Sequence, residues 1–311
     1  MSEKIVSTLI TQIGDPFVLH ASDGKYYMYA TESERECRFD VYVSENIKDW
    51  KKVGTCYKPT ERSFGYKNFW APEVVEHNGK FIMHYTARWK KNHSLRMGVA
   101  VSDSPLGPFI DVYDNEPMFD PGYASIDGDV FIDDDGKAYL YFSRDCCDNV
   151  AKNGEHQSHI YCVRLTKDLL RTIGKPKFIC GPDPKLEHEM HENLFNEGSF
   201  KWNEGPFVFK INGEYLLMYS ANFVWTKYYC ICGAKAKSPW GPFEKYDKPI
   251  AQYIEGKVSG PGHNCVFKDD KGQMYCAYHC HTDPNLACND RKFCIDKLDY
   301  VDGKLKMKIT L

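Results

Sequence analysis

Five stretches of the chain share one pattern of apolar and polar positions. In each, a short β-type run leads into a turn that ends in glycine, and an aromatic-rich apolar run follows. This arrangement predicts a β-hairpin, because paired strands flank a tight turn that a glycine can adopt. The predicted hairpins span residues 15–31, 70–87, 127–143, 204–221 and 263–279.

The hairpins recur at regular intervals, since their turn glycines are separated by 55, 57, 77 and 59 residues. A weaker hairpin follows within four of the repeats, and SPLGPF and SPWGPF are near copies of each other within two of these. The fifth repeat ends in a hairpin over residues 293–309. Two hairpins give the four strands of a propeller blade. We therefore predict an all-β fold, a single-domain five-bladed β-propeller over residues 1–311.

Bulk composition narrows the choice of partners. The formal net charge is −3 over 311 residues, which disfavours a nucleic acid or an anionic membrane as the partner. No apolar run approaches the length of a membrane-spanning helix. Aromatic residues make up 14% of the chain, which suits a β-rich protein and equally a protein that stacks sugar rings. The oligomeric state is left open.

Cysteine usage bears on the cellular compartment. The chain has 13 cysteines and no CxxC pair. Its first residues lack the apolar core of a signal peptide. We therefore expect a cytoplasmic protein whose thiols are mostly reduced and buried.

One register position concentrates the candidate chemistry. Nine residues before each turn glycine stands a functional side chain: Asp15, Trp70, Asp127, Glu204 and His263. The innermost strands of a propeller run the same way along its axis, so residues at one register should form a ring on one face. Three carboxylates in such a ring repel one another and are costly to desolvate. The ring is therefore a candidate functional site.

Each member of the ring also has a plainer interpretation on its own. Asp15 and Glu204 precede prolines or glycines as many solvated turn residues do, Trp70 could be a core residue, and His263 a satisfied polar one. The shared register favours the functional interpretation. Two carboxylates across a pocket can serve a glycosidase, one protonating the departing oxygen and the other activating water. A third carboxylate can raise the pKa of the acid, and a tryptophan can stack on a sugar.

Motifs at these residues, spread over the full chain, resemble those of glycoside hydrolase family 43, which contains β-xylosidases, α-L-arabinofuranosidases and arabinanases. The matching motifs are Gly14-Asp15-Pro16, Trp70-Ala71-Pro72-Glu73, Ile126-Asp127-Gly128, Glu204-Gly205-Pro206 and Gly262-His263-Asn264. One departure is Glu73, where family members commonly have aspartate.

The resemblance implies a role for each site residue. Asp15 would be the general base, Glu204 the general acid and Asp127 the residue that modulates the pKa of the acid, in an inverting single displacement. His263 resembles a histidine that holds a hydrated calcium ion at the axis or lines the site floor. Arg291 resembles an arginine that reaches toward the substrate and the modulator aspartate. No organic cofactor is implied.

Two histidine-rich segments suggest zinc only weakly. His279-Cys280-His281 puts two imidazoles on one face of a strand, but no spaced pair completes four ligands. The segment 187–192 imitates the HExxH motif but is one residue short. We interpret it as a loop or short helix at the lip of the pocket.

The leading hypothesis is therefore a hydrolase that releases xylose or L-arabinofuranose from short plant-polysaccharide oligosaccharides, with Trp70, Arg291 and His263 contacting the substrate. An endo-acting arabinanase would use the same ring in an open groove. A non-catalytic sugar-binding propeller would have no need of both Asp15 and Glu204. A retaining fructan hydrolase would have asparagine before the first aspartate, where this chain has Gly14.

Overall fold

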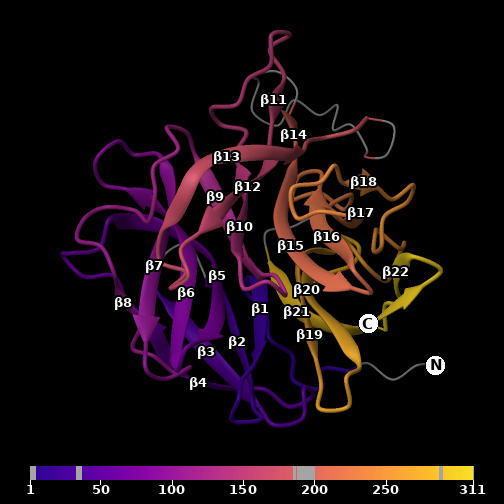
Figure 1. The fold of residues 1–311 in the computed structure, drawn as a ribbon. Coiled ribbons are helices and arrows are strands. Elements are labelled where there is room, and N and C mark those ends of the chain that lie inside the picture. Colours follow the sequence, from indigo (N-terminus) through magenta and orange to yellow (C-terminus); the bar gives the residue numbers. More distant parts are fainter. Residues whose placement is uncertain (1–4, 33–36, 185–186, 188–199, 287–289, 311) are drawn as a thin grey trace.

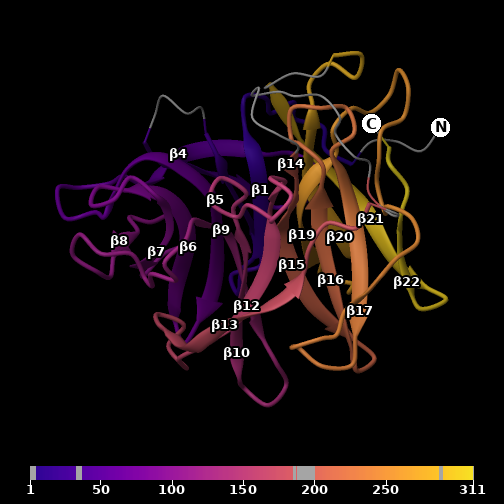
Figure 2. The same cartoon turned by 90° about the horizontal axis from the view of Figure 1, so that it is seen from above.

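The computed structural model describes residues 5–32, 37–184, 187, 200–286 and 290–310. Five four-stranded antiparallel sheets form the molecule, and the innermost strands gather around its centre (Figure 1). Seen from above, the first two sheets occupy one side and the last two the other, so the sheets follow one another around the axis in chain order (Figure 2). The predicted five-bladed β-propeller is confirmed.

The strands of each blade are consecutive or nearly so. Blade 1 contains β1 (Gly14–His20), β2 (Tyr26–Thr31), β3 (Phe39–Ser44) and β4 (Lys51–Tyr57). Blade 2 contains β5 (Gly65–His77), β6 (Lys80–Trp89), β7 (Leu95–Ser102) and β8 (Ile110–Asp111). Blade 3 contains β9 (Ser125–Ile132), β10 (Ala138–Arg144), β12 (His159–Leu165) and β13 (Thr172–Cys180). Blade 4 contains β15 (Asn203–Ile211), β16 (Glu214–Ala221), β17 (Cys230–Ala236) and β18 (Glu244–Lys245). Blade 5 contains β19 (Gly262–Lys268), β20 (Met274–His281), β21 (Arg291–Val301) and β22 (Lys304–Met307).

A short parallel pair, β11 (His156–Gln157) and β14 (Phe200–Lys201), lies outside the blades. It joins an excursion of blade 3 to the chain just before the inner strand of blade 4. In the part of the chain that the structure describes, no helix has the length and apolar character needed to cross a membrane.

The two SPxGPF copies attach one blade to the blade before it. The hydroxyl of Tyr29 in blade 1 donates to the carbonyl of Pro105 at 2.7 Å, and the Phe109 ring meets the Tyr29 ring edge-on at 6.1 Å. Tyr141 in blade 3 makes the same hydrogen bond to the carbonyl of Pro239 in blade 4. Each buried tyrosine therefore has a partner for its hydroxyl, which offsets the cost of desolvating it.

The propeller closes between blades 5 and 1. The amide of Phe293 in β21 donates to the carbonyl of Ile10 at 3.0 Å, so the segment before β1 pairs with the last blade. Nearer the axis, the amide of Val18 in β1 donates to the sulfur of Cys265 in β19 at 3.1 Å. These contacts join blade 1 and the segment before it to the last blade.

Every inner strand carries a β-bulge at the same depth. In each, two residues of the inner strand face one residue of the second strand, and the first bulged residue has a positive φ. These residues are Asp15 (52°), Ala71 (44°), Asp127 (56°), Gly205 (55°) and His263 (46°). Non-glycine residues in this region are uncommon and strained, and such strain clusters at functional sites.

The expectation that the predicted ring occupies a single register is therefore wrong for two of its members. Trp70 and Glu204 precede the bulge by one residue, whereas Asp15, Asp127 and His263 are the bulged residues themselves. The reason lies in the turns. In blades 2 and 4 a two-residue Asn-Gly turn connects the first two strands, whereas the corresponding turns of the other three blades are longer. Nine residues before the turn glycine is therefore the bulged residue in blades 1, 3 and 5 but the residue before it in blades 2 and 4.

All twelve cysteines within the described ranges are free thiols, and most are buried. Cys280 and Cys294 approach each other on paired strands with their sulfurs 3.4 Å apart, and the sulfurs of Cys230 and Cys232 are 3.8 Å apart. The sulfurs therefore pack as small apolar groups with weak hydrogen bonds.

Candidate active site

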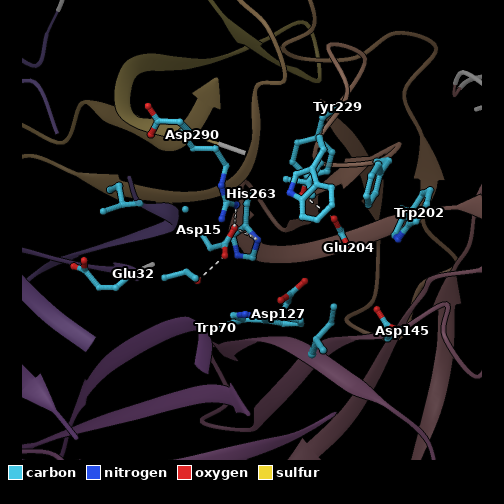
Figure 3. Close-up of a pocket in the computed structure, with 18 of the residues that line it drawn as sticks. Asp15, Glu32, Trp70, Asp127, Asp145, Trp202, Glu204, Tyr229, His263 and Asp290 are labelled. Atoms are coloured by element: carbon cyan, nitrogen blue, oxygen red, sulfur yellow. Dashed lines mark hydrogen bonds and ion pairs between the residues drawn. The ribbon is translucent and has the colours of Figure 1, made fainter. Parts of the chain in front are cut away.

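A pocket of about 650 Å³ opens at the end of the axis where the bulges lie. Figure 3 shows carboxylates of Asp15, Asp127 and Glu204 around one central space. The structure brings all six predicted site residues into this pocket: Asp15, Trp70, Asp127, Glu204, His263 and Arg291. Side chains from residues 15 to 291 of the chain thus meet in one place because each blade delivers its bulge to the same face.

Asp15 lies among positively charged and hydrogen-bonding groups. Arg291 donates to its Oδ1 at 2.9 Å, and the Thr31 hydroxyl donates to its Oδ2 at 2.6 Å. His263 Nδ1 lies 3.4 Å from Oδ1. Burial opposes the charge on Asp15, but Arg291, His263 and Thr31 together outweigh burial and hold the pKa of Asp15 well below its ordinary value. Asp15 is therefore ionised throughout the physiological range.

His279 fixes the backbone of Asp15 rather than neutralising its side chain. The Asp15 amide donates to Nδ1 of His279 at 3.0 Å, so that nitrogen must be unprotonated. Full burial lowers the pKa of His279 well below the ordinary value, with the nearby Arg291 acting in the same direction. His279 is thus neutral, and Arg291 is the permanent positive charge beside Asp15.

Glu204 has the opposite environment. Tyr229 donates to its Oε1 at 3.0 Å. Burial raises the pKa of Glu204 to about 8, the negative charges of Asp145 and Asp15 add to this rise, and the Tyr229 hydrogen bond and Arg291 oppose it. Glu204 therefore carries a proton at neutral pH.

Asp127 lies between these two groups. Its Oδ2 accepts the Gly205 amide at 3.2 Å, and its own amide donates to the Thr86 hydroxyl at 3.1 Å. Burial raises its pKa to about 7; His263 opposes the rise, and Glu204 and Asp15 increase it. Because Asp127 and Glu204 raise each other's affinity for protons, their titrations are linked.

Two glycines at the position before the bulge make room for pocket residues. A Cβ on Gly14 would lie 2.0 Å from the guanidinium carbon of Arg291, and a Cβ on Gly262 would lie 2.0 Å from the ring of Tyr229. Arg291 pairs with Asp15 and Tyr229 with Glu204, so each glycine permits a contact to one of the two key carboxyl groups. The resemblance implied that Arg291 reaches the modulator aspartate, whereas its ion pair here is with Asp15.

The chain matches the family model described as "Glycosyl hydrolases family 43" over residues 7–305. It is 28% identical over 305 residues to "Beta-D-galactofuranosidase xynD" of Aspergillus niger, covering 93% of this chain and 81% of the relative. It is 27% identical to "Beta-xylosidase" of Xylanibacter ruminicola, covering 91% and 93% of the two chains. The crystal structure of a thermostable family-43 glycoside hydrolase superposes with a TM-score of 0.88 at 40% identity, covering 99% of this chain and 96% of the other. The chain belongs to glycosyl hydrolase family 43. It is a glycosidase.

A second recurrent position in this family-43 chain was not predicted from the sequence. Seven residues after each turn glycine stands a hydroxyl or imidazole: Thr31, Thr86, Ser143, Ser220 and His279. In four cases this side chain accepts a hydrogen bond from the backbone amide of the bulged residue in the next blade. Between blades 3 and 4 the Gly205 amide instead donates to Asp127. The spacing was readable from the sequence and would have identified the groups that hold the bulges.

Other pocket residues had no sequence signal. Tyr229 and Asp145 lie in connections after second strands, and the aromatic residues Trp202, Phe223 and Trp225 lie before β15 and after β16. None of these positions recurs in the repeats, so only the folded chain brings them to the pocket.

The metal expectation can be tested against the donor atoms present. Among the described residues no group of three histidine, cysteine, aspartate or glutamate side chains could hold a metal ion. His281 bonds Ser259 and the carbonyl of Val224, and His279 bonds Asp15, so the two imidazoles are engaged separately. The amide of Asn264, next to His263, is buried without a hydrogen-bond partner. With both imidazoles engaged elsewhere, the amide oxygen of Asn264 is a donor that remains, and it suits a hydrated ion that prefers oxygen ligands better than it suits zinc.

The segment 187–192 is only partly described. Glu187 is buried and accepts hydrogen bonds from Asn203 and Tyr219, at 2.8 and 3.0 Å. Lys245 forms an ion pair with the same carboxylate. The Glu187 side chain is thus tied to blade 4. The predicted loop or short helix over residues 188–192 lies outside the described residues.

Proposed function

We propose that this protein is an inverting glycosidase that releases xylose or L-arabinofuranose from short plant-polysaccharide oligosaccharides. The observation that carries the proposal is the contrast between the surroundings of two carboxyl groups in one pocket: Arg291 donates to Asp15, whereas Glu204 is hydrogen-bonded by the neutral hydroxyl of Tyr229. Asp15 is held ionised by Arg291, while burial keeps a proton on Glu204. A base and an acid available at the same pH are what a single displacement requires.

In this mechanism Asp15 takes a proton from a water molecule as that water attacks the anomeric carbon. The new carbon–oxygen bond forms on one face of the sugar while the glycosidic bond breaks on the other. Glu204 gives its proton to the departing oxygen, so the leaving sugar is released as a neutral alcohol. Asp15 ends protonated and Glu204 ionised, and exchange with solvent restores both.

The remaining ring members orient the reaction. Asp127 accepts a hydrogen bond from the Gly205 amide, directly after Glu204, so the charge on Asp127 influences the proton affinity of the acid. Arg291 holds the carboxylate of Asp15 in one orientation, from which it can take a proton from the attacking water. Trp70 lines the pocket and offers an indole face to a sugar ring, and His263 lies beside Asp15.

The sugar specificity is inferred from relatives. One of those named above is called a β-xylosidase and another a β-D-galactofuranosidase, so the choice of glycone varies among similar chains. We propose xylose or L-arabinofuranose as the released sugar and treat galactofuranose as an outcome of the test. Endo-acting arabinan cleavage and sugar binding without catalysis are the other outcomes.

A panel of aryl β-D-xyloside, aryl α-L-arabinofuranoside, aryl β-D-galactofuranoside and linear arabinan, with product analysis, tests the proposal. The expected result is release of a monosaccharide from one of the first two, with the first product in the anomeric configuration opposite to the substrate by NMR. Internal arabinan fragments would identify an endo-acting enzyme. Binding of sugars without turnover of any substrate would favour the non-catalytic propeller.

We also propose that an ion bound at the axis is a calcium ion held by His263 and otherwise by water. It would add positive charge near Asp15 and Asp127, and no step above passes through it. Chelation should lower thermal stability or activity modestly, and calcium should restore it. Full loss of activity that only zinc reverses would contradict this assignment.

A further inference from the structure

We infer that the aromatic shelf formed by Trp202, Phe223 and Trp225 is the binding subsite for the leaving-group sugar, and that it takes an uncharged sugar ring. This inference rests on the proposed function, because it uses Glu204 as the proton donor. It adds the chemistry and the location of the part of the substrate that is released as alcohol.

The position of Glu204 determines on which side of the pocket the leaving sugar lies. Glu204 must contact the glycosidic oxygen, so the leaving sugar has to extend toward the Glu204 side of the pocket. Trp202 precedes Glu204 by two residues in the chain, and Phe223 and Trp225 follow β16, the strand paired with β15. In Figure 3 Trp202 lies on the Glu204 side, while Glu32 and Asp290 lie beyond Asp15 on the other.

The rings form a supported platform. Trp202 is buried and stacks on Phe200 at 5.6 Å, and its ring lies 4.7 Å from Phe223. Phe223 in turn meets Trp225 at 5.2 Å, and Trp225 is 45% exposed at the pocket. A large, partly exposed indole backed by packed rings loses little conformational entropy when it stacks on the apolar face of a sugar.

The backbone beneath the shelf is anchored. The side chain of Asn203 donates to the Trp202 carbonyl and to Glu187, both at 2.8 Å, and Lys245 donates to its oxygen at 2.8 Å. All three anchoring side chains are buried or nearly so. The short segment that carries both Trp202 and Glu204 is therefore held as a unit, so shelf and acid keep a fixed relation.

The charge of the pocket selects the chemistry of the ligand. Its lining contains six carboxyl groups, from Asp15, Glu32, Asp127, Asp145, Glu204 and Asp290, against one arginine. Asp145 lies on the same side of the view as Trp202 and Glu204 (Figure 3) and can accept a hydrogen bond from a sugar hydroxyl. On this side of the pocket Glu204 carries a proton, and Asp15 beyond it is paired with Arg291, so the carboxylate that a leaving sugar meets is Asp145. A sugar that carries a carboxylate would be repelled by Asp145, so the subsite favours neutral pentoses or hexoses over uronic acids.

The test compares two substrates that differ only in the leaving group. A glycosyl fluoride of the preferred sugar has no leaving-group ring, whereas the matching disaccharide has one. Trp225→Ala should lower kcat/KM for the disaccharide about tenfold, mostly through KM, and leave the fluoride within about twofold. Trp225→Phe should recover part of the loss. Phe178→Ala, which removes another exposed ring outside the pocket, should change neither substrate.

The outcomes separate this inference from the proposed function. If the wild-type protein cleaves neither substrate, the proposed function fails. If the wild type cleaves both and Trp225→Ala cleaves the disaccharide normally, or loses both substrates equally, the shelf is not the leaving-group subsite. A disaccharide whose leaving sugar is a uronic acid should be cleaved at least about tenfold more slowly than its neutral counterpart. Equal rates would overturn the assigned ligand chemistry.

Discussion

Two groups of carboxyl side chains lie near the propeller axis, and they differ in what surrounds them. Asp15, Asp127 and Glu204 line the pocket. Glu73 and Asp129 lie two residues after the bulged residues of blades 2 and 3 and are hydrogen-bonded to each other. Glu73 is 6% exposed and Asp129 2%.

Among the residues that the structure describes, none gives the deep pair a positive partner of the kind that Arg291 gives Asp15. Burial raises the pKa of Glu73 well above its ordinary value, and the charges of Asp129 and Asp127 raise it further. Burial also raises the pKa of Asp129, against the hydrogen bonds from the Val208 amide, at 2.7 Å, and Glu73. The pair therefore stays protonated at neutral pH, and its two titrations are linked.

Position along the axis decides whether a carboxyl group is available for chemistry or held protonated between blades. At the pocket, Arg291 beside Asp15 and burial around Glu204 shift the two pKa values in opposite directions, which leaves one group ionised and the other protonated at neutral pH. Deeper, both pKa values move the same way, and the pair links blades 2 and 3 while Asp129 links blade 3 to blade 4. Glu73, the departure from the commoner aspartate, therefore belongs to this deep pair and is not among the residues that line the pocket.

The largest expected effect is on Asp15. Asp15→Asn removes the proposed base, and kcat/KM should fall about 10²–10⁴-fold on every substrate, whatever its leaving group. Steady-state kinetics on an aryl glycoside and on a disaccharide measures this. Asp103→Asn, at an exposed aspartate, is the matched control and should behave like the wild type. A loss confined to poor leaving groups would mean that Asp15 is not the base.

Glu204→Gln should be nearly as damaging on natural substrates, about 10²–10⁴-fold, because the departing oxygen needs a proton. The loss should be much smaller for a glycoside of an activated phenol, which leaves as an anion. Comparing phenols of graded acidity measures the difference. Equal losses across that series would show that Glu204 acts in some other way.

At the deep pair the expected effect is on stability. Asp129→Ala leaves the Val208 amide and Glu73 without their buried partner, and the free energy of unfolding should fall by about 2–3 kcal/mol. Denaturant unfolding measures it, and kcat of the folded protein should stay close to the wild-type value. A loss of kcat comparable to that of Asp15→Asn would erase the distinction between the two groups.

The same pair makes a prediction about pH. Its pKa values in the folded protein lie above the ordinary ones, so its stabilising contribution is complete below about pH 4 and is lost as the pH rises toward about 8. Glu73→Gln removes one of the two groups and should therefore lose less stability between pH 6 and pH 9 than the wild type does. Melting temperatures across that range test this, and identical slopes would count against raised pKa values for the pair.

The smallest expected effect concerns Asp145. Its negative charge helps to raise the pKa of Glu204, so Asp145→Asn should lower that pKa. Activity needs the protonated acid, and the basic limb of the kcat/KM profile should move to lower pH while the acidic limb stays in place. A movement to higher pH, or movement of the acidic limb alone, would contradict this electrostatic role.

Much of this was determined by the sequence itself. The turn glycines and strand periodicity are local signals, so they predicted five blades, the hairpin in the second half of each blade and the face where the functional side chains meet. The motifs around Asp15, Asp127 and Glu204 predicted the family. Local patterns carry such information because a strand and a tight turn depend on residues close together in the chain.

The tertiary structure decided the rest. Whether Asp15 is a stronger acid than Glu204 depends on Arg291, which is far from Asp15 in the sequence, and on the burial of Glu204. The one-residue shift of Trp70 and Glu204 depends on bulges that only strand pairing reveals. The shelf of Trp202, Phe223 and Trp225 leaves no periodic signal. Burial and charge at a site are sums over all neighbours in space, and a linear chain does not specify those neighbours until it has folded.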